Sequence, residues 1–313
     1  MSGPRDKIKT YPLSSRHSLV DRDDLGRPRS AGVSFKDWLC GMPRSFGARG
    51  MSELARAIVE ARQADRPVIV GLGGHVIKTG CSPYLIDLAQ RGLISAIVFN
   101  GSVMIHDFEL AFAGKTSEDV AQSLGRGEFG MATETAEYLN RFIRQGIEAG
   151  RGLGGAVGRG ILDLVPPYLK ISLLAAIERL GLQAYGVIAL GTDILHMHPQ
   201  FPAELCATGC MRDFDALTQI VAQLDGGVYL NLGSAVLLPE VFLKALSVAR
   251  NIEGAPTNFT TANLDFIQHY RPTQNVITRP VAQGGQGIAI TGHHEILIPM
   301  LHQTLVEIVS DAR

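Results

Sequence analysis

Short apolar runs alternate with longer amphipathic segments along most of the chain after residue 50. Apolar residues recur at helical spacing over 51–65, and PVIVGLGG at 67–74 is typical of a buried strand that ends in glycines. A helix is expected over 83–92 and a second strand over 93–100. This alternation predicts parallel βαβ units.

The alternation resumes after a helical middle. Helices are expected over 132–150, 165–181, 212–224 and 237–251, with a glycine-rich stretch at 151–160 and strands at 184–193 and 226–234. The apolar runs ITRPVA and GIAITG then flank AQGGQ, and a last helix is expected from about 294. Five to seven strands with helices on both faces predict a doubly wound, mostly parallel, Rossmann-like α/β sheet.

The chain divides into two parts of different character. Residues 1–45 are polar and contain four prolines, so we expect an arm that packs on a partner subunit. Residues 46–313 are expected to form a single Rossmann-like domain. The first 18 residues contain no apolar stretch of the kind that a secretory signal requires.

Composition excludes several classes of protein. Hydrophobic residues make up 46% of the 313 residues, enough for a sizeable core, and the formal charge of −1 leaves no positive surplus for nucleic acid. No uninterrupted apolar window reaches the roughly 18 residues of a membrane span. The four cysteines are few and unevenly spaced, which favours reduced thiols and a cytoplasmic protein. Neither nucleic acid nor membrane is expected as a partner.

Four expected strands end in residues suited to a ligand, and ligands of open α/β sheets bind beyond these ends. The four ends are Gly71–His75, Asn100–Ser102, Gly191–Asp193 and Asn231–Ser234. Glycines such as Gly73 and Gly74 would let backbone N–H groups approach a pyrophosphate, or would serve tight packing between strand and helix. No G-x-G-x-x-G fingerprint is present, so the four ends together predict the nucleotide site.

Polar clusters near these ends suggest further chemistry. His106, beside Asp107 and Glu109, suits proton transfer or ribose binding, although acids also favour a helix start. A zinc site is an alternative for His196, His198, Cys206 and Cys210, which otherwise are polar groups beside Asp193 and buried thiols. His293 and His294 open the last helix, either at the rim of a crevice or as a solvated cap. Neither a G-x-S-x-G elbow nor a P-loop is present.

Residues 67–114 resemble the NAD-binding domain of archaeal- and cyanobacterial-type ornithine cyclodeaminases. The matching motifs are Thr79–Leu85 and Asn100–Glu109. The order of elements over about 50–305 is similar to that of deoxyhypusine synthase, which belongs to the same superfamily. Residues 188–198 and 260–266 resemble two further segments of that enzyme.

The resemblance implies NAD as the cofactor and assigns residues to it. Asp193 would contact the cofactor, with Thr192 and Ser102 beside it, and the glycine turns would approach its phosphates and ribose. The remaining residues that the resemblance implies in the cofactor groove are Gly74, His75, Asn100, Gly101, Gly233 and Ser234. Gly73 and Asp107 are expected to bind the cofactor from their place at the strand ends. Residues 277–296 contain no lysine where deoxyhypusine synthase carries its transfer lysine, so that reaction is not expected.

The resulting hypothesis is NAD-dependent oxidation of a small amine or amino acid to an imine. His106 or His196 would accept a proton, and Glu109 would assist in catalysis. Asp107 and Glu109 would bind the cofactor or an ammonium group. The alternatives are a non-catalytic dinucleotide-binding protein and a metal-dependent hydrolase that uses His196, His198 and Cys206. A homo-oligomer, with a tetramer favoured over a monomer, is expected from the arm and the resemblance.

Overall fold

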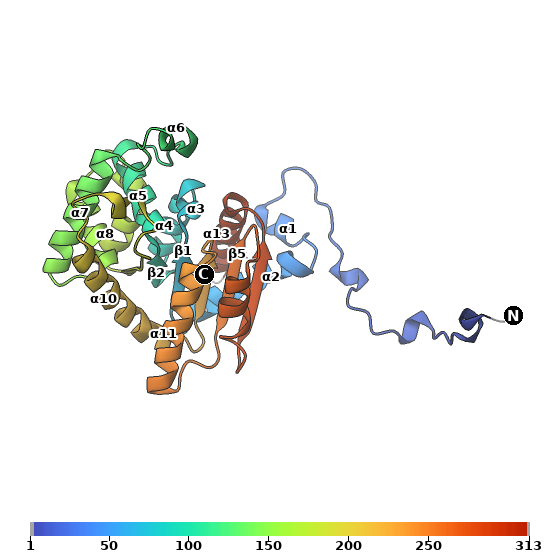
Figure 1. Cartoon of the computed structure of the whole chain (residues 1–313). Coiled ribbons are helices and arrows are strands. Elements are labelled where there is room, and N and C mark those ends of the chain that lie inside the picture. Colours follow the sequence, from blue (N-terminus) through green and yellow to red (C-terminus); the bar gives the residue numbers. More distant parts are fainter. Residues whose placement is uncertain (1–2, 312–313) are drawn as a thin grey trace.

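The structure is a computed structural model that describes residues 3–311, and a six-stranded sheet forms its centre (Figure 1). All neighbouring strands are parallel, in the order β3-β2-β1-β4-β5-β6. This order confirms the doubly wound α/β fold. The strands are β1 (Val68–Leu72), β2 (Ala96–Phe99), β3 (Gln183–Gly186), β4 (Val228–Leu232), β5 (Thr260–Asp265) and β6 (Gln286–Thr291).

The central strands are apolar on both faces because helices cover both. In β1, Val68 and Val70 join one apolar cluster, whereas Ile69 joins a second on the opposite face. The first cluster includes side chains of α2 (Phe46–Gln63), α3 (Gly74–Lys78), α4 (Ser82–Gln90), α5 (Gly101–Ala113), α7 (Thr133–Glu148), α8 (Leu153–Leu164), α9 (Leu173–Arg179) and α13 (His294–Asp311). The second is completed by α10 (Ala203–Ala222) and α11 (Leu237–Glu253).

The helices follow from the apolar periodicity. In α7, Leu139, Ile143 and Ile147 recur every four residues and are all buried, while the intervening positions are largely polar. Burying one such side chain stabilises the fold by about 1.5–3 kcal/mol. The same spacing explains why the expected helices and the observed ones largely coincide.

The glycine-rich stretch 151–160 is an unexpected helix. Most of it belongs to α8, because its glycines lie where the helix touches neighbouring backbone. A Cβ on Gly154 would lie 2.0 Å from the carbonyl oxygen of Ala184, and one on Gly158 would lie 2.9 Å from that of Leu174. The glycines therefore allow close packing of α8 on the edge of the sheet and on α9.

Other boundaries also differ from the expected ones. The apolar run at 184–193 leaves the sheet after Gly186, and the helix expected from 165 begins at Leu173, beyond Pro166 and Pro167. β5 was not identified from the pattern. The run ITRPVA does not join the sheet, and its start lies in a π-helical turn (Thr273–Thr278).

Residues 3–45 form short helical turns (Figure 1). The start of this segment extends away from the sheet, whereas its last helix contacts α13. The turns are η1 (Pro4–Lys7), η2 (Leu13–Ser15), η3 (Arg22–Asp24) and α1 (Phe35–Leu39). The remaining short elements of the chain are α6 (Val120–Leu124), η4 (Leu169–Ile171), η5 (Ile194–Met197) and α12 (Tyr270–Pro272). The division into an arm and a domain 46–313 stays a prediction. Among residues 3–311 we find no helix with the length and apolar character of a membrane span.

The order in which strands join the sheet reverses between β1 and β4. The chain adds β2 and β3 on one side of β1 and then β4, β5 and β6 on the other. The turns after β1 and β4 pack back to back, because a Cβ on Gly73 would lie 2.1 Å from the carbonyl oxygen of Gly233. In sheets of this order, ligands bind in the crevice beside such a switch point.

Candidate functional site

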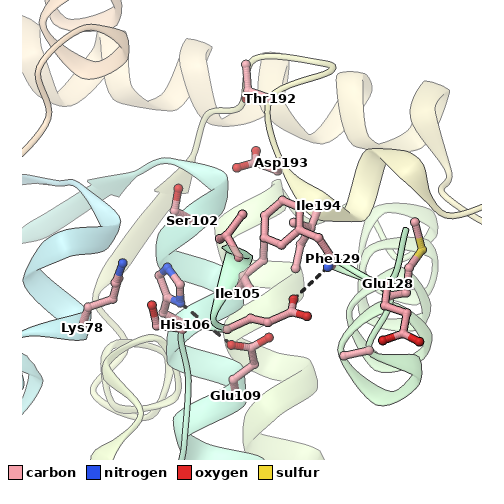
Figure 2. A pocket seen from close by; sticks show the side chains of 16 residues that line it. Lys78, Ser102, Ile105, His106, Glu109, Glu128, Phe129, Thr192, Asp193 and Ile194 are labelled. Atoms are coloured by element: carbon pink, nitrogen blue, oxygen red, sulfur yellow. Dashed lines mark hydrogen bonds and ion pairs between the residues drawn. The ribbon is translucent and has the colours of Figure 1, made fainter. Parts of the chain in front are cut away.

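A pocket of about 610 Å³ opens beyond the carboxyl ends of β2 and β3 (Figure 2). One wall is the first half of α5, and the opposite wall is the loop that follows β3. Residues 117–132 and Lys78 of α3 complete it. Besides His106, the ionisable residues that line the pocket are four carboxylates (Glu109, Glu118, Glu128 and Asp193) and one ammonium group (Lys78). We therefore call it the acidic pocket.

Two of the carboxylates have a partner that reduces their effect on a ligand. Glu128 pairs with Arg126 at 2.7 Å, and both side chains are exposed. Glu118 accepts the backbone N–H of Gly130 at 2.8 Å through Oε2, an interaction that fixes the far wall. The chemistry of the pocket is therefore concentrated at Glu109 and Asp193.

His106, Thr116 and Glu109 form a hydrogen-bonded relay on the pocket wall. The Thr116 hydroxyl donates to Glu109 Oε2 at 2.6 Å and lies 2.7 Å from His106 Nδ1. A hydroxyl has one proton, so it must accept from Nδ1–H of His106. His106 Nε2 therefore carries the lone pair, on a side chain that lines the pocket. This arrangement suits a general base.

Glu109 is the charged end of this relay. Its Oε1 accepts from the Thr135 hydroxyl at 3.1 Å, so both carboxylate oxygens are hydrogen-bonded. Burial opposes ionisation, but the interactions with His106, Thr116 and Thr135 outweigh it and lower the pKa of Glu109. Glu109 acts on a ligand through Thr116 and His106 rather than by direct contact.

Asp193 lies on the opposite wall with an unsatisfied oxygen. Its Oδ2 is buried and has no hydrogen-bond partner among residues 3–311. It rests against the start of α5, where a Cβ on Gly101 would lie 2.0 Å from it. Burial raises the pKa of Asp193, against the opposing influence of His196 and His106. An unpartnered buried carboxylate oxygen is costly, so this atom suits a ligand that donates an O–H or N–H.

Asp107 does not reach the pocket, contrary to its expected role in cofactor binding. It is 1% exposed, and its carboxylate accepts from the Ser172 hydroxyl at 2.6 Å and from backbone N–H of Leu173 and Leu174 at 2.7 and 3.2 Å. It therefore supports the first turn of α9. Burial raises the pKa of Asp107 to about 6, despite these hydrogen bonds.

His196 is not a proton acceptor, because its lone pair is already used. Its Nδ1 accepts the backbone N–H of Gly191 at 3.1 Å and of Asp193 at 3.0 Å. Burial lowers the pKa of His196. The neutral ring therefore shapes the loop that presents Asp193.

The structure does not bring the residues of the metal alternative together in the described part of the chain. No group of three or more histidine, cysteine, aspartate or glutamate side chains within residues 3–311 is arranged to hold a metal ion. His198 Nε2 donates to the carbonyl oxygen of Gly130 at 2.9 Å. Cys206 is buried and interacts with Cys210, four residues later in α10.

The glycines at the strand ends allow neighbouring turns to pack closely against each other. A Cβ on Gly74 would lie 2.5 Å from that of Ser102, just as Gly101 accommodates Asp193. Packing thus accounts for these glycines without a ligand. Of the other residues in the expected groove, Ser102 and Thr192 line the pocket.

The remaining expected residues lie at the rim or support the strand ends. Asn100 caps α5 by accepting from Val103 N at 3.3 Å, and Ser234 accepts from Leu238 N at 3.2 Å. His75 is exposed, outside the pocket lining, with its ring 5.4 Å from that of His294. His294 is fully buried rather than solvated, and it donates Nε2–H to the carbonyl oxygen of Leu264.

Two residues of the site were not identified from the sequence: Thr116, the middle residue of the relay, and Lys78, the cation that lines the pocket. Thr116 lies in the polar loop after α5 and Lys78 at the end of a five-residue helix, so neither carries a periodic signal. Both enter the pocket only through tertiary folding. His106, Glu109, Ser102, Thr192 and Asp193 are the expected residues that the structure brings together.

The geometry is compatible with a dinucleotide. The acidic pocket lies beyond the carboxyl ends of β2 and β3, where ligands of such sheets bind, and Asp193 Oδ2 lacks the donor that a ribose hydroxyl would supply. Ser102 and Thr192 offer further hydroxyls beside it. Of the residues that line the pocket, these three could hold such a cofactor.

Solved structures resemble this chain, whereas no family model and no curated protein sequence matches it. AgrE, solved in a ternary complex with ornithine and NAD+, is 15% identical with a TM-score of 0.58 over 87% of this chain. A conserved putative LOR/SDH protein from Methanococcus maripaludis S2 is 15% identical, with a TM-score of 0.53 over 83%. A putative deoxyhypusine synthase from Entamoeba histolytica is 9% identical, with a TM-score of 0.52 over 90%.

These likenesses confirm the expected fold. The chain is similar in structure to deoxyhypusine synthase-like and LOR/SDH domains, with a six-stranded parallel sheet flanked by helices. It covers 96% of the Entamoeba protein and 69% of the Methanococcus protein, but only 35%, about a third, of AgrE.

Proposed function

We propose that the protein binds NAD and oxidises a small amine or amino acid to an imine in the acidic pocket. The observation that carries the proposal is the relay from Glu109 through Thr116 to His106, which leaves His106 Nε2 as a proton acceptor in an acid-lined pocket. The fold is also similar to that of about a third of AgrE, a protein that was solved with ornithine and NAD+.

Asp193, Ser102 and Thr192 would hold the cofactor, with Asp193 Oδ2 accepting from a ribose hydroxyl. When bound, NAD would supply the two-electron acceptor for the C–H bond beside the nitrogen. The protein's own residues would do the rest. The pocket carboxylates attract a cationic amine, and His106 Nε2 removes the proton that must leave before the nitrogen can form the imine.

Lys78 bears on the choice between an amine and an amino acid. It is the only lysine or arginine among the residues that line the pocket in the described part of the chain. An amino acid would place its carboxylate near this ammonium and its amino group near His106. A simple amine would leave Lys78 without a ligand group to bind.

The test begins with mass spectrometry of small molecules released by denaturing the purified protein, together with calorimetric titration of NAD. Bound or titratable NAD is expected. Formation of reduced nicotinamide is then followed with ornithine, other amino acids and polyamines. If neither release nor titration detects a dinucleotide, the redox proposal is wrong. If NAD binds but no amine is oxidised across the panel, the protein is a dinucleotide-binding protein without this activity.

A further inference from the structure

The N-terminal arm carries apolar side chains that its own body leaves uncovered. Every hydrogen bond found for residues 3–18 is to another residue of that segment, and the arm leads away from the sheet (Figure 1). Five large apolar side chains along it are exposed by 58–89%: Ile8, Tyr11, Leu13, Leu19 and Val20. Single exposed apolar residues are ordinary, but five within thirteen positions form a surface that favours a partner.

A groove of about 710 Å³ runs along β6, where the arm leaves the body. Leu19 and Val20 line it together with residues 286–289 and Thr291 of β6. β6 is the last strand in the sheet order and pairs only with β5 in the described chain. Its other edge therefore presents unpaired N–H and C=O groups, which can accept another strand.

The groove also has an apolar anchor point at its end. Phe46 lines it and is 86% exposed, although it opens the helix that packs beside β6. Its φ of 43° lies in the left-handed region, which an aromatic residue seldom adopts. An aromatic side chain in this position gains most if another chain covers it.

The charges of the arm and the groove are complementary. Residues 8–18 contain two basic side chains, Lys9 and Arg16, and no acidic one. The groove is lined by Asp24 and Glu53, with Arg49 as its single lysine or arginine among the described residues. An arm that lies in the groove would therefore bring a surplus of positive charge to a weakly acidic surface.

We propose that the arm of one copy of this chain lies in the β6 groove of a second copy. Since each arm departs beside the groove, a two-fold axis at this edge lets both arms cross at once, and the contact closes as a symmetric pair. The occupant is residues 8–18, which would pair with the free edge of β6 and bury Ile8, Tyr11 and Leu13 against the partner subunit.

Light scattering of the full chain tests the assembly. The expected mass is twice the 33.7 kDa of one chain or an even multiple of it. The triple variant Ile8→Asp, Leu13→Asp and Leu19→Asp is expected to have half that mass by light scattering and an unchanged circular dichroism spectrum. Ile252→Asp is the matched control, because Ile252 is 71% exposed on α11, and it is expected to keep the wild-type mass. A monomeric wild type, or a triple variant with the wild-type mass, would overturn the proposal.

A photo-crosslinker at position 11 tests the place of docking. Dimers are assembled from light and heavy isotope-labelled chains, so that crosslinks between copies differ in mass from crosslinks within one copy. Crosslinks between copies to residues 286–291 are expected. Crosslinks only within one chain would mean that the arm folds back on its own groove, and crosslinks to another surface of the second copy would place the interface elsewhere. Both outcomes reject this docking site, and neither depends on NAD binding.

Discussion

The hydroxyl of Thr116 lies 2.7 Å from Nδ1 of His106, and its own proton points to Glu109. This contact fixes the tautomer of His106 and joins a loop to the middle of α5. It therefore makes Thr116 a positioning residue for the proposed proton acceptor.

Thr116→Val is expected to lower the rate of amine oxidation about tenfold or more, because general-base catalysis contributes about 100- to 10,000-fold and depends on orientation. The loss should appear in kcat, with KM for the amine little changed. Thr116→Ser keeps the hydroxyl and should restore most of the rate. A serine variant as slow as the valine variant would show that Thr116 only packs the loop.

Asp193→Ala is expected to weaken NAD binding by about 10- to 100-fold, since a hydrogen bond to a charged acceptor contributes about 1.5–3 kcal/mol. Calorimetric titration measures the affinity. Glu128→Gln is the control, because Glu128 lines the same pocket but already pairs with Arg126. Equal affinities for wild type and Asp193→Ala would contradict the assignment of Asp193 to the cofactor.

Asp107→Ala is expected to reduce the free energy of unfolding by about 3 kcal/mol without a specific effect on NAD affinity. Two backbone N–H groups and a buried hydroxyl at the start of α9 would lose their acceptor. Urea denaturation measures the stability, and titration of the folded fraction measures the affinity. Loss of NAD affinity in a fully stable variant would restore the role in the site that the sequence suggested.

Asp213 is expected to make the free energy of unfolding fall as the pH rises. Its Oδ2 accepts N–H of Gly154 and Gly186, both at 2.7 Å, but burial raises the pKa of Asp213 to about 7. A carboxyl with an unfolded pKa near 3.9 then binds an extra proton in the folded state. Its contribution to stability is therefore full at low pH and is lost as pH rises from about 4 to about 7.

Asp213→Asn keeps an acceptor for both N–H groups and cannot ionise. The stability of this variant relative to wild type is expected to be higher at about pH 8 than at about pH 5, as measured by urea denaturation. Groups that titrate alike in both proteins cancel in this difference. An identical difference at the two pH values would mean that Asp213 does not bind the extra proton.

Local patterns predicted the sheet because burial on both faces leaves a strong signal. The run at 67–74 is uniformly apolar, and β1 occupies its centre. The pattern failed at β5, where Asn263 is fully buried and bonds to Asn231 of the neighbouring strand at 2.7 Å. Such polar ladders in a core resemble loop composition when the sequence is viewed alone.

The site was predictable only in part, for a related reason. Asp193 and His106 were identified because they follow strands, and the carboxyl ends of parallel strands lie at the same edge of the sheet. The pattern could not separate His106 from Asp107, although adjacent residues of a helix point about 100° apart. One faces the pocket and the other faces α9, and that distinction depends on packing that no local window contains.

The position of β1 in the middle of the sheet has a consequence for how the chain is made. Val68 pairs with Val228, about half of the 313-residue chain later. During synthesis, β1 and β2 leave the ribosome long before β4 is made. The edge of β1 that pairs with β4 therefore has no partner strand during that time. Contacts between such distant positions slow folding and expose intermediates to aggregation. The first half of this chain is therefore the part that most needs protection by chaperones until residue 232 has emerged.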